Sequence, residues 1–149
     1  MIGIGSDHGG FELKEELKKH LDEQGIAYRD FGTDSAASCD YPVFAEAVAR
    51  AVVSGEVEKG ILICGTGIGI SIAANKVKGI RAALCSDCYS AEFTRRHNDA
   101  NILTMGARVV GSGLACKIVD TFLSTEFEGG RHAKRVALIT DIEERENAK

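Results

Sequence analysis

The sequence predicts an α/β fold in which a parallel sheet is covered by helices on both faces. Apolar, strand-like runs alternate with amphipathic helical segments along the whole chain, which is the pattern of consecutive βαβ units. The 149 residues are enough to bury one substantial core and too few for two ordinary domains. We therefore expect one domain over residues 1–149, with a helical tail from about residue 131.

Five apolar runs are expected to form the strands. They cover residues 1–5, 26–31, 60–64, 80–85 and 102–106. The helices between them are predicted at residues 11–24, 43–53, after residue 67, at about 89–96 and at 112–123. In the first helix, Leu13, Leu17 and Leu21 share one face, and Gly25 is its expected stop. Pro42 suits the first turn of the second helix.

Composition excludes several classes of function. A net charge of −4 argues against a general nucleic-acid binder, and no basic leader or long apolar run indicates export or a membrane span. We expect a soluble, cytoplasmic protein. The five cysteines are an odd number and should be reduced, with a redox role of Cys85 and Cys88 left open. No group of His, Cys and carboxylate residues has metal-ligand spacing, so we predict no metal.

The segment from Gly60 to Ser71 carries the clearest chemical signal. An apolar strand runs directly into Cys64, then into a loop with glycines at 65, 67 and 69 and a hydroxyl at Thr66. If a helix follows Gly67, its unpaired N–H groups would stabilise a thiolate or a bound oxyanion. A base, a hydroxyl and backbone donors in six residues favour enolate chemistry.

Three further segments bring polar side chains to the carboxyl ends of strands, where ligands bind in such sheets. Asp7 and His8 follow the first strand, and neither glycine-rich loop completes a nucleotide-binding fingerprint. His97 and Asn98 precede the last strand, where a histidine could act as an acid or base. Arg131 and Arg135 have i, i+4 spacing suited to a phosphate clamp, which Arg108 could join, although a solvated helix end is the alternative.

Six ordered motifs support a resemblance that covers nearly the whole chain. They are Ser6-Asp-His-Gly-Gly-Phe-Glu-Leu-Lys14, Asp40-Tyr-Pro42, Cys64-Gly-Thr-Gly-Ile-Gly69, Arg96-His-Asn-Asp-Ala-Asn101, Gly106-Ala-Arg108 and Gly130-Arg-His132. With them the chain resembles the type B ribose-5-phosphate isomerases, whose family also holds allose-6-phosphate and galactose-6-phosphate isomerases. The resemblance implies a Rossmann-like three-layer α/β/α sandwich with a five-stranded parallel sheet, a homodimer, and no metal or nucleotide cofactor.

The resemblance also implies roles for individual residues. Cys64 would be the base that moves a proton between C2 and C1 through a cis-enediolate, and Thr66 would exchange the proton between the two oxygens. His97, aided by Asp7, would open the furanose ring. The anion hole would comprise Gly65, Gly67, Ile68 and Gly69, with Asn98 assisting. Phosphate would be held by His8, Arg131, Arg135 and Arg108, and Tyr41 would line the sugar pocket.

The same resemblance implies that His97, Asn98 and Arg108 reach into the pocket of the neighbouring subunit. The expected activity is the interconversion of ribose 5-phosphate and ribulose 5-phosphate in the pentose phosphate pathway. Two alternatives stay open: isomerisation of a six-carbon sugar phosphate, and a module that binds a phosphosugar without turnover. A dehydrogenase is a third, less favoured class, because the NAD fingerprint is incomplete.

Overall fold

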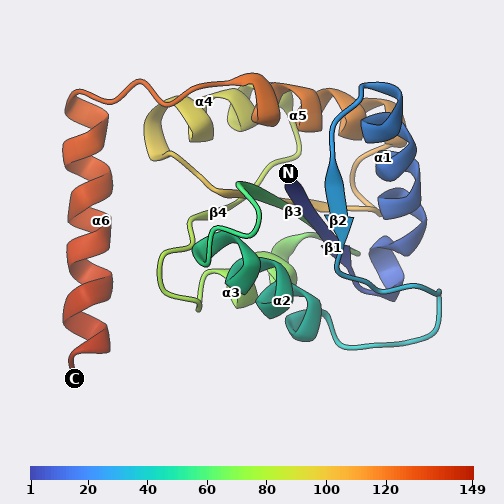
Figure 1. The fold of residues 1–149 in the computed structure, drawn as a ribbon, viewed down its shortest axis with the longest axis horizontal. Coiled ribbons are helices and arrows are strands. Elements are labelled where there is room, and N and C mark those ends of the chain that lie inside the picture. Colours follow the sequence, from blue (N-terminus) through green and yellow to red (C-terminus); the bar gives the residue numbers. More distant parts are fainter.

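A computed structural model describes all residues 1–149 and contains one sheet of five parallel strands (Figure 1). The strands are β1 (Ile2–Ser6), β2 (Tyr28–Asp30), β3 (Lys59–Cys64), β4 (Ala82–Leu84) and β5 (Ile102–Gly106), in the spatial order β2-β1-β3-β5-β4. The helices are α1 (Phe11–Glu23), α2 (Tyr41–Val53), α3 (Ile68–Ala74), α4 (Cys88–Asn98), α5 (Ser112–Ser124) and α6 (Arg131–Asn147), with a 3₁₀ turn η1 (His8–Gly10).

The helices cover both faces of the sheet, which confirms the predicted three-layer sandwich. One core joins β1, β3 and β5 to α1, α4 and α5, and the other joins the opposite face to α2 and α3 (Figure 1). Alternation along β3 divides the two cores: Ile61 and Ile63 belong to the first, and Leu62 and Cys64 to the second. The Cys64 side chain therefore leaves the sheet on the α3 side.

The two edge strands are shorter than predicted. The expected strands at residues 26–31 and 80–85 shrink to Tyr28–Asp30 and Ala82–Leu84. Each pairs with a neighbour on one side only, β2 with β1 and β4 with β5. Single backbone hydrogen bonds continue past both strands, from the Phe31 N–H to the Ile4 carbonyl and from the Cys85 N–H to the Thr104 carbonyl, but the regular pairing stops at Asp30 and Leu84.

A buried lysine ties β2 to α1. Lys14 is completely buried, and its ammonium group lies 2.6 Å from the carboxylate of Asp30, which also accepts a bond from Lys18 at 2.8 Å. Burial alone would raise the pKa of Asp30, but hydrogen bonds from Lys14, Lys18 and the Gly32 N–H outweigh it, so the pKa lies below its ordinary value.

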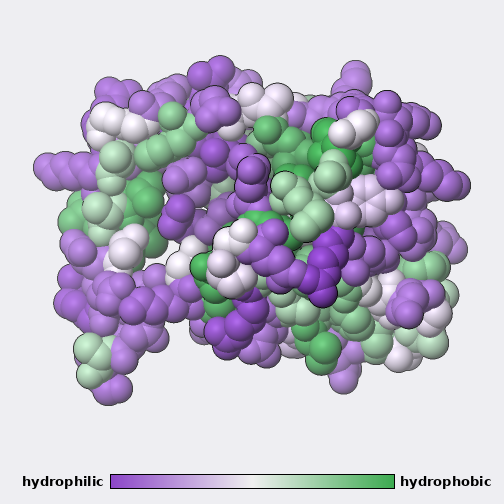
Figure 2. Space-filling view, in the orientation of Figure 1, coloured by the Kyte–Doolittle hydropathy of each residue, from purple (hydrophilic) through white to green (hydrophobic).

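Helix α6 stands apart from the sandwich, at the left of Figure 1. It packs against α4, and the carboxylate of Glu143 accepts the N–H of Gly79. Its side chains Leu138, Ile139 and Ile142 are about half exposed, and Figure 2 shows apolar atoms along this helix. No helix of the chain is both long and apolar enough to span a membrane.

Candidate active site

The candidate site lies where β1 and β3 end side by side. Because the two strands are parallel neighbours, the segments that leave them meet at one edge of the sheet. The 3₁₀ turn after β1 touches the glycine loop after β3: a Cβ atom on Gly9 would lie only 3.3 Å from the Gly65 nitrogen. The two motifs that the sequence placed at this edge are therefore in contact.

The loop after β3 folds back onto the thiol of Cys64. The N–H of Gly67 donates a hydrogen bond to the Cys64 sulfur at 3.1 Å. Gly67 reaches this geometry with a positive φ of 80°, which a residue with a side chain rarely adopts. Cys64 is buried, with 5% of its surface exposed, and it lines neither of the two cavities described below.

The loop also satisfies a second of its own N–H groups. Thr66 is exposed, and its hydroxyl oxygen accepts the N–H of Ile68 at 3.2 Å. The N–H groups of Gly67 and Ile68, both expected in the anion hole, are thus engaged by side chains of the loop itself. A substrate oxygen would have to replace the thiol or the hydroxyl as their acceptor, which links oxyanion binding to release of those two groups.

Tyr41 stands directly against the glycine loop. It begins α2, and a Cβ atom on Gly69 would lie 2.6 Å from the Cζ of its ring. Only a glycine at position 69 leaves room for this approach. The ring is 39% exposed and forms a wall beside the loop, and its expected place in a sugar pocket stays a prediction.

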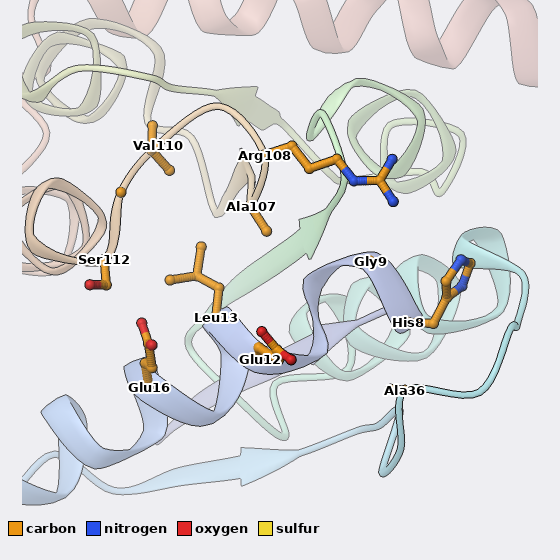
Figure 3. A pocket seen from close by; sticks show the side chains of 11 residues that line it. His8, Gly9, Glu12, Leu13, Glu16, Ala36, Ala107, Arg108, Val110 and Ser112 are labelled. Atoms are coloured by element: carbon orange, nitrogen blue, oxygen red, sulfur yellow. The ribbon is translucent and has the colours of Figure 1, made fainter.

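His8 and Arg108 share a cavity of about 380 Å³ beside the glycine loop (Figure 3). The Nδ1 of His8 accepts the N–H of Cys39 at 3.2 Å, which assigns the proton of the neutral ring to Nε2 and leaves a donor free. The Arg108 guanidinium extends over Gly65 and makes no ion pair. Within one chain Arg108 therefore lies in the same cavity as His8; its expected reach into a neighbouring subunit stays a prediction.

Asp7 has a structural partner in this chain. It is buried, and its carboxylate accepts the N–H of Gly10 at 3.1 Å and so caps the η1 turn. The expected help of Asp7 to His97 has no counterpart among the contacts within one chain.

A second cluster of polar side chains lies where α4 ends and α6 begins. The rings of His97 and His132 stack at 3.9 Å between centroids, and the Glu128 carboxylate lies 3.4 Å from the Nε2 of His132 and 3.7 Å from that of His97. Burial, together with the positive charges of His97 and Arg131, holds the pKa of His132 below its usual value. Arg131 and Arg135 are exposed on α6 and have no carboxylate partner.

The cluster at His97 and the residues near Cys64 and His8 do not share a cavity within one chain. His97 and Asn98 line a cavity of about 360 Å³ with the aromatic residues of α4, and neither Cys64 nor His8 lines it. None of the residues from α4 or α6 lines the cavity at His8 and Arg108. His97, expected to open the ring, therefore lies beside the first turn of α6, which carries Arg131, whereas the expected base Cys64 lies at the same sheet edge as Asp7, His8 and Arg108.

Three contributions could not be seen in the sequence. The Cys39 N–H fixes the His8 ring, Glu128 joins His97 and His132, and Glu12 points into the cavity beside His8 (Figure 3). Glu128 stands 31 residues from His97 in the chain and lies in the segment between α5 and α6. No local pattern signals such a meeting.

The Cys64 thiol accepts a backbone N–H at the switch point of a parallel sheet, and a histidine and an arginine line a cavity at the same edge, where a small anionic substrate can bind. A family model described as Ribose/Galactose Isomerase matches residues 2–139. The chain belongs to this family and is an isomerase.

Individual relatives agree over almost the full length. The chain is 57% identical over 146 residues to ribose-5-phosphate isomerase B of Escherichia coli, covering 98% of each chain. It superposes on the structure of Clostridium thermocellum ribose-5-phosphate isomerase B with a TM-score of 0.95 and 60% identity, covering 97% of each chain. A structure of the Mycoplasma genitalium enzyme with bound ribulose 5-phosphate gives a TM-score of 0.91 and 43% identity, covering 96% of this chain and 95% of that one.

Proposed function

We propose that this chain interconverts ribose 5-phosphate and ribulose 5-phosphate, as a cytoplasmic enzyme of the pentose phosphate pathway. The observation that carries the proposal is the Cys64 sulfur, which accepts the Gly67 N–H 3.1 Å away at the edge where His8 and Arg108 also lie. The names of the relatives in Escherichia coli and Clostridium thermocellum, and the ribulose 5-phosphate bound to the Mycoplasma genitalium relative, support this choice of substrate.

The proposed chemistry moves protons and leaves the substrate's overall oxidation state unchanged. His97 opens the furanose ring, and the Cys64 thiolate then removes the proton from C2 of the aldose. The electron pair of that bond forms the C1–C2 double bond of a cis-enediolate, whose negative oxygen the N–H groups of the glycine loop stabilise. Thr66 carries a proton between the two oxygens, and Cys64 returns its proton to C1 to give the ketose.

A phosphate group can bind the cationic side chains of both clusters. His8 offers its Nε2–H and Arg108 a free guanidinium, and Arg131 and Arg135 bring two further unpaired guanidinium groups from α6. Guanidinium forks bind phosphate oxygens in pairs, so three guanidinium groups and one imidazole can hold a dianion firmly.

We infer that the working enzyme is a homodimer whose active sites are shared between subunits. One chain supplies Cys64 and His8, and its partner supplies His97, Asn98, the two arginines of α6 and, as the resemblance implies, Arg108. The separation of these groups in one chain supports the inference, because neither cavity holds a complete set. The apolar side chains on the projecting α6 support it too, since a monomer would leave them in water.

An isomerase assay tests the proposal. Purified protein is supplied with ribose 5-phosphate, allose 6-phosphate and galactose 6-phosphate in deuterated water, and we expect turnover of the pentose with solvent deuterium entering the product. Preference for a six-carbon substrate would replace the pentose proposal with the second activity that the family description allows.

Two cysteine substitutions distinguish catalysis from binding without turnover. Cys64→Ala should abolish turnover and keep affinity for the sugar phosphate, whereas Cys116→Ala, on the remote helix α5, should behave like wild type. Tight binding without turnover by the wild-type protein would instead support a phosphosugar-binding module.

A further inference from the structure

Three side chains from distant parts of the sequence converge on one point outside the glycine loop. They are His97 at the end of α4, Glu128 in the segment before α6, and His132 in the first turn of α6. One ligand atom from each, the two Nε2 atoms and a Glu128 oxygen, all lie within 4.8 Å of one another. No other three His, Cys, Asp or Glu residues of the chain come this close.

Two of the three separations between these atoms are close to those of ligands around a tetrahedral ion. Two ligands that each lie about 2.0–2.1 Å from a tetrahedral zinc ion are separated by about 3.4 Å. The Glu128 oxygen lies 3.4 Å from the Nε2 of His132 and 3.7 Å from the Nε2 of His97. Two imidazoles and a carboxylate are a donor set that zinc, cobalt and nickel ions accept.

Two of the ligands are already held in place. His132 is 6% exposed and cannot move far. The segment that carries Glu128 is fastened to α4, because its N–H donates to the Arg96 carbonyl at 3.0 Å and its second carboxylate oxygen accepts from the Arg96 guanidinium at 3.4 Å. Arg96 thus orients the carboxylate so that its other oxygen faces the imidazoles.

His97 is the ligand that must adjust. The two rings are parallel to within 8°, so an ion in the plane of one ring lies off the plane of the other. The His97 side chain is 37% exposed, and its Nε2 has only the Glu128 contact at 3.7 Å to hold it. A rotation of this ring directs its lone pair to the shared point. Arg131 and Arg135 nearby oppose a cation and limit the affinity of the site.

We propose that His97, Glu128 and His132 form a binding site for a divalent transition-metal ion, and that the bound ion inhibits the enzyme. Binding needs only the three side chains described above. Inhibition rests on the proposed function, because it follows from the ion occupying the imidazole that opens the sugar ring.

Zinc titration of protein with isotope-labelled histidine tests binding directly. The chain has four histidines, so each ring can be followed separately by NMR. We expect the His97 and His132 signals to shift, while those of His20, which pairs with Asp120 at 2.7 Å, stay in place. Zinc that moves only the His8 signals would indicate binding beside Cys39 and would overturn the proposal.

Substitutions sharpen the test. Glu128→Gln keeps the size of the side chain and should weaken zinc binding by at least tenfold, and His132→Ala by more, given that even outer-shell partners contribute about 10- to 100-fold. His20→Ala is the matched control and should bind like wild type. If His132→Ala does not fold, Glu128→Gln decides alone, and unchanged zinc affinity in it would refute the site.

Inhibition of the isomerase activity by zinc is the second test. Micromolar zinc should inhibit the wild-type enzyme reversibly, a chelator should restore turnover, and Glu128→Gln should need a higher zinc concentration for the same inhibition. Equal inhibition of wild type and Glu128→Gln would mean that the ion acts elsewhere, for example on the Cys64 thiol. A protein that isomerises no sugar phosphate but still shows shifted His97 and His132 signals would keep the metal site and refute the proposed function.

Discussion

Gly106→Ala should disable the site through a clash that the structure locates in the glycine loop. Gly106 ends β5 beside Cys64, and an added Cβ would lie 2.5 Å from the carbonyl carbon and oxygen of Thr66. Ordinary contact begins at 3.4 Å, so the loop must move by about 0.9 Å. A displacement of this size at a catalytic group costs on the order of 100-fold in rate.

The glycine loop cannot move by this distance without losing hydrogen bonds that join it to β5 and to the residue after β5. The Ala107 N–H donates to the Cys64 carbonyl at 2.9 Å, and the Thr104 hydroxyl donates to the Gly67 carbonyl at 3.1 Å. We expect the free energy of unfolding to fall by about 1–3 kcal/mol as well, as in other overpacked cores.

Steady-state kinetics and denaturant unfolding measure the two effects of Gly106→Ala. Gly113→Ala is the matched control, because a Cβ there meets nothing within 4 Å in the first turn of α5, and it should keep full activity with a stability gain of up to about 1 kcal/mol. A Gly106→Ala enzyme with wild-type kcat would refute the reasoning that the loop position sets the rate.

Three other substitutions test separate contacts. Arg131→Ala should raise KM by about 10- to 150-fold, from the loss of about 1.5–3 kcal/mol of charge-assisted hydrogen bonding, whereas Arg145→Ala on the same helix should not. Cys39→Pro removes the N–H that fixes the His8 ring and should change the tautomer of His8, which nitrogen NMR can measure. Cys39→Ala keeps this N–H and should leave the tautomer unchanged. An unchanged tautomer in the proline variant would contradict this assignment. Asp30→Ala leaves the buried lysine of α1 without its carboxylate and should lower the free energy of unfolding by about 3 kcal/mol at neutral pH. Because the folded-state pKa of Asp30 lies below its ordinary value, its contribution should be complete above that ordinary value and decline as the pH falls toward the lower one; a constant difference between wild type and variant down to pH 2 would refute it.

The fold could be predicted because its determinants are local. Alternating apolar runs and helical faces, such as the leucine stripe of α1, follow from neighbouring residues in the chain. The lengths of β2 and β4 could not be predicted, because β1 and β5 run on past the last paired residues Asp30 and Leu84, and no local signal in the sequence marks where the pairing of an edge strand stops.

The contacts of the site also fall into local ones, which a sequence can indicate, and tertiary ones, which it cannot. The contact of Cys64 with its own loop spans three residues, so a sequence pattern could indicate it. The placement of Arg108 over Gly65, and the approach of Glu128 to His97, depend on how loops from different strands pack. Tertiary packing alone decides such contacts.

Complementation between two inactive variants tests the shared active site most directly. Cys64→Ala and His97→Ala subunits are unfolded together, refolded as a mixture and assayed with ribose 5-phosphate. In a mixed dimer one of the two sites receives both intact residues, so random pairing should restore about a quarter of wild-type activity. A mixture no more active than its parents would contradict a site built from two subunits.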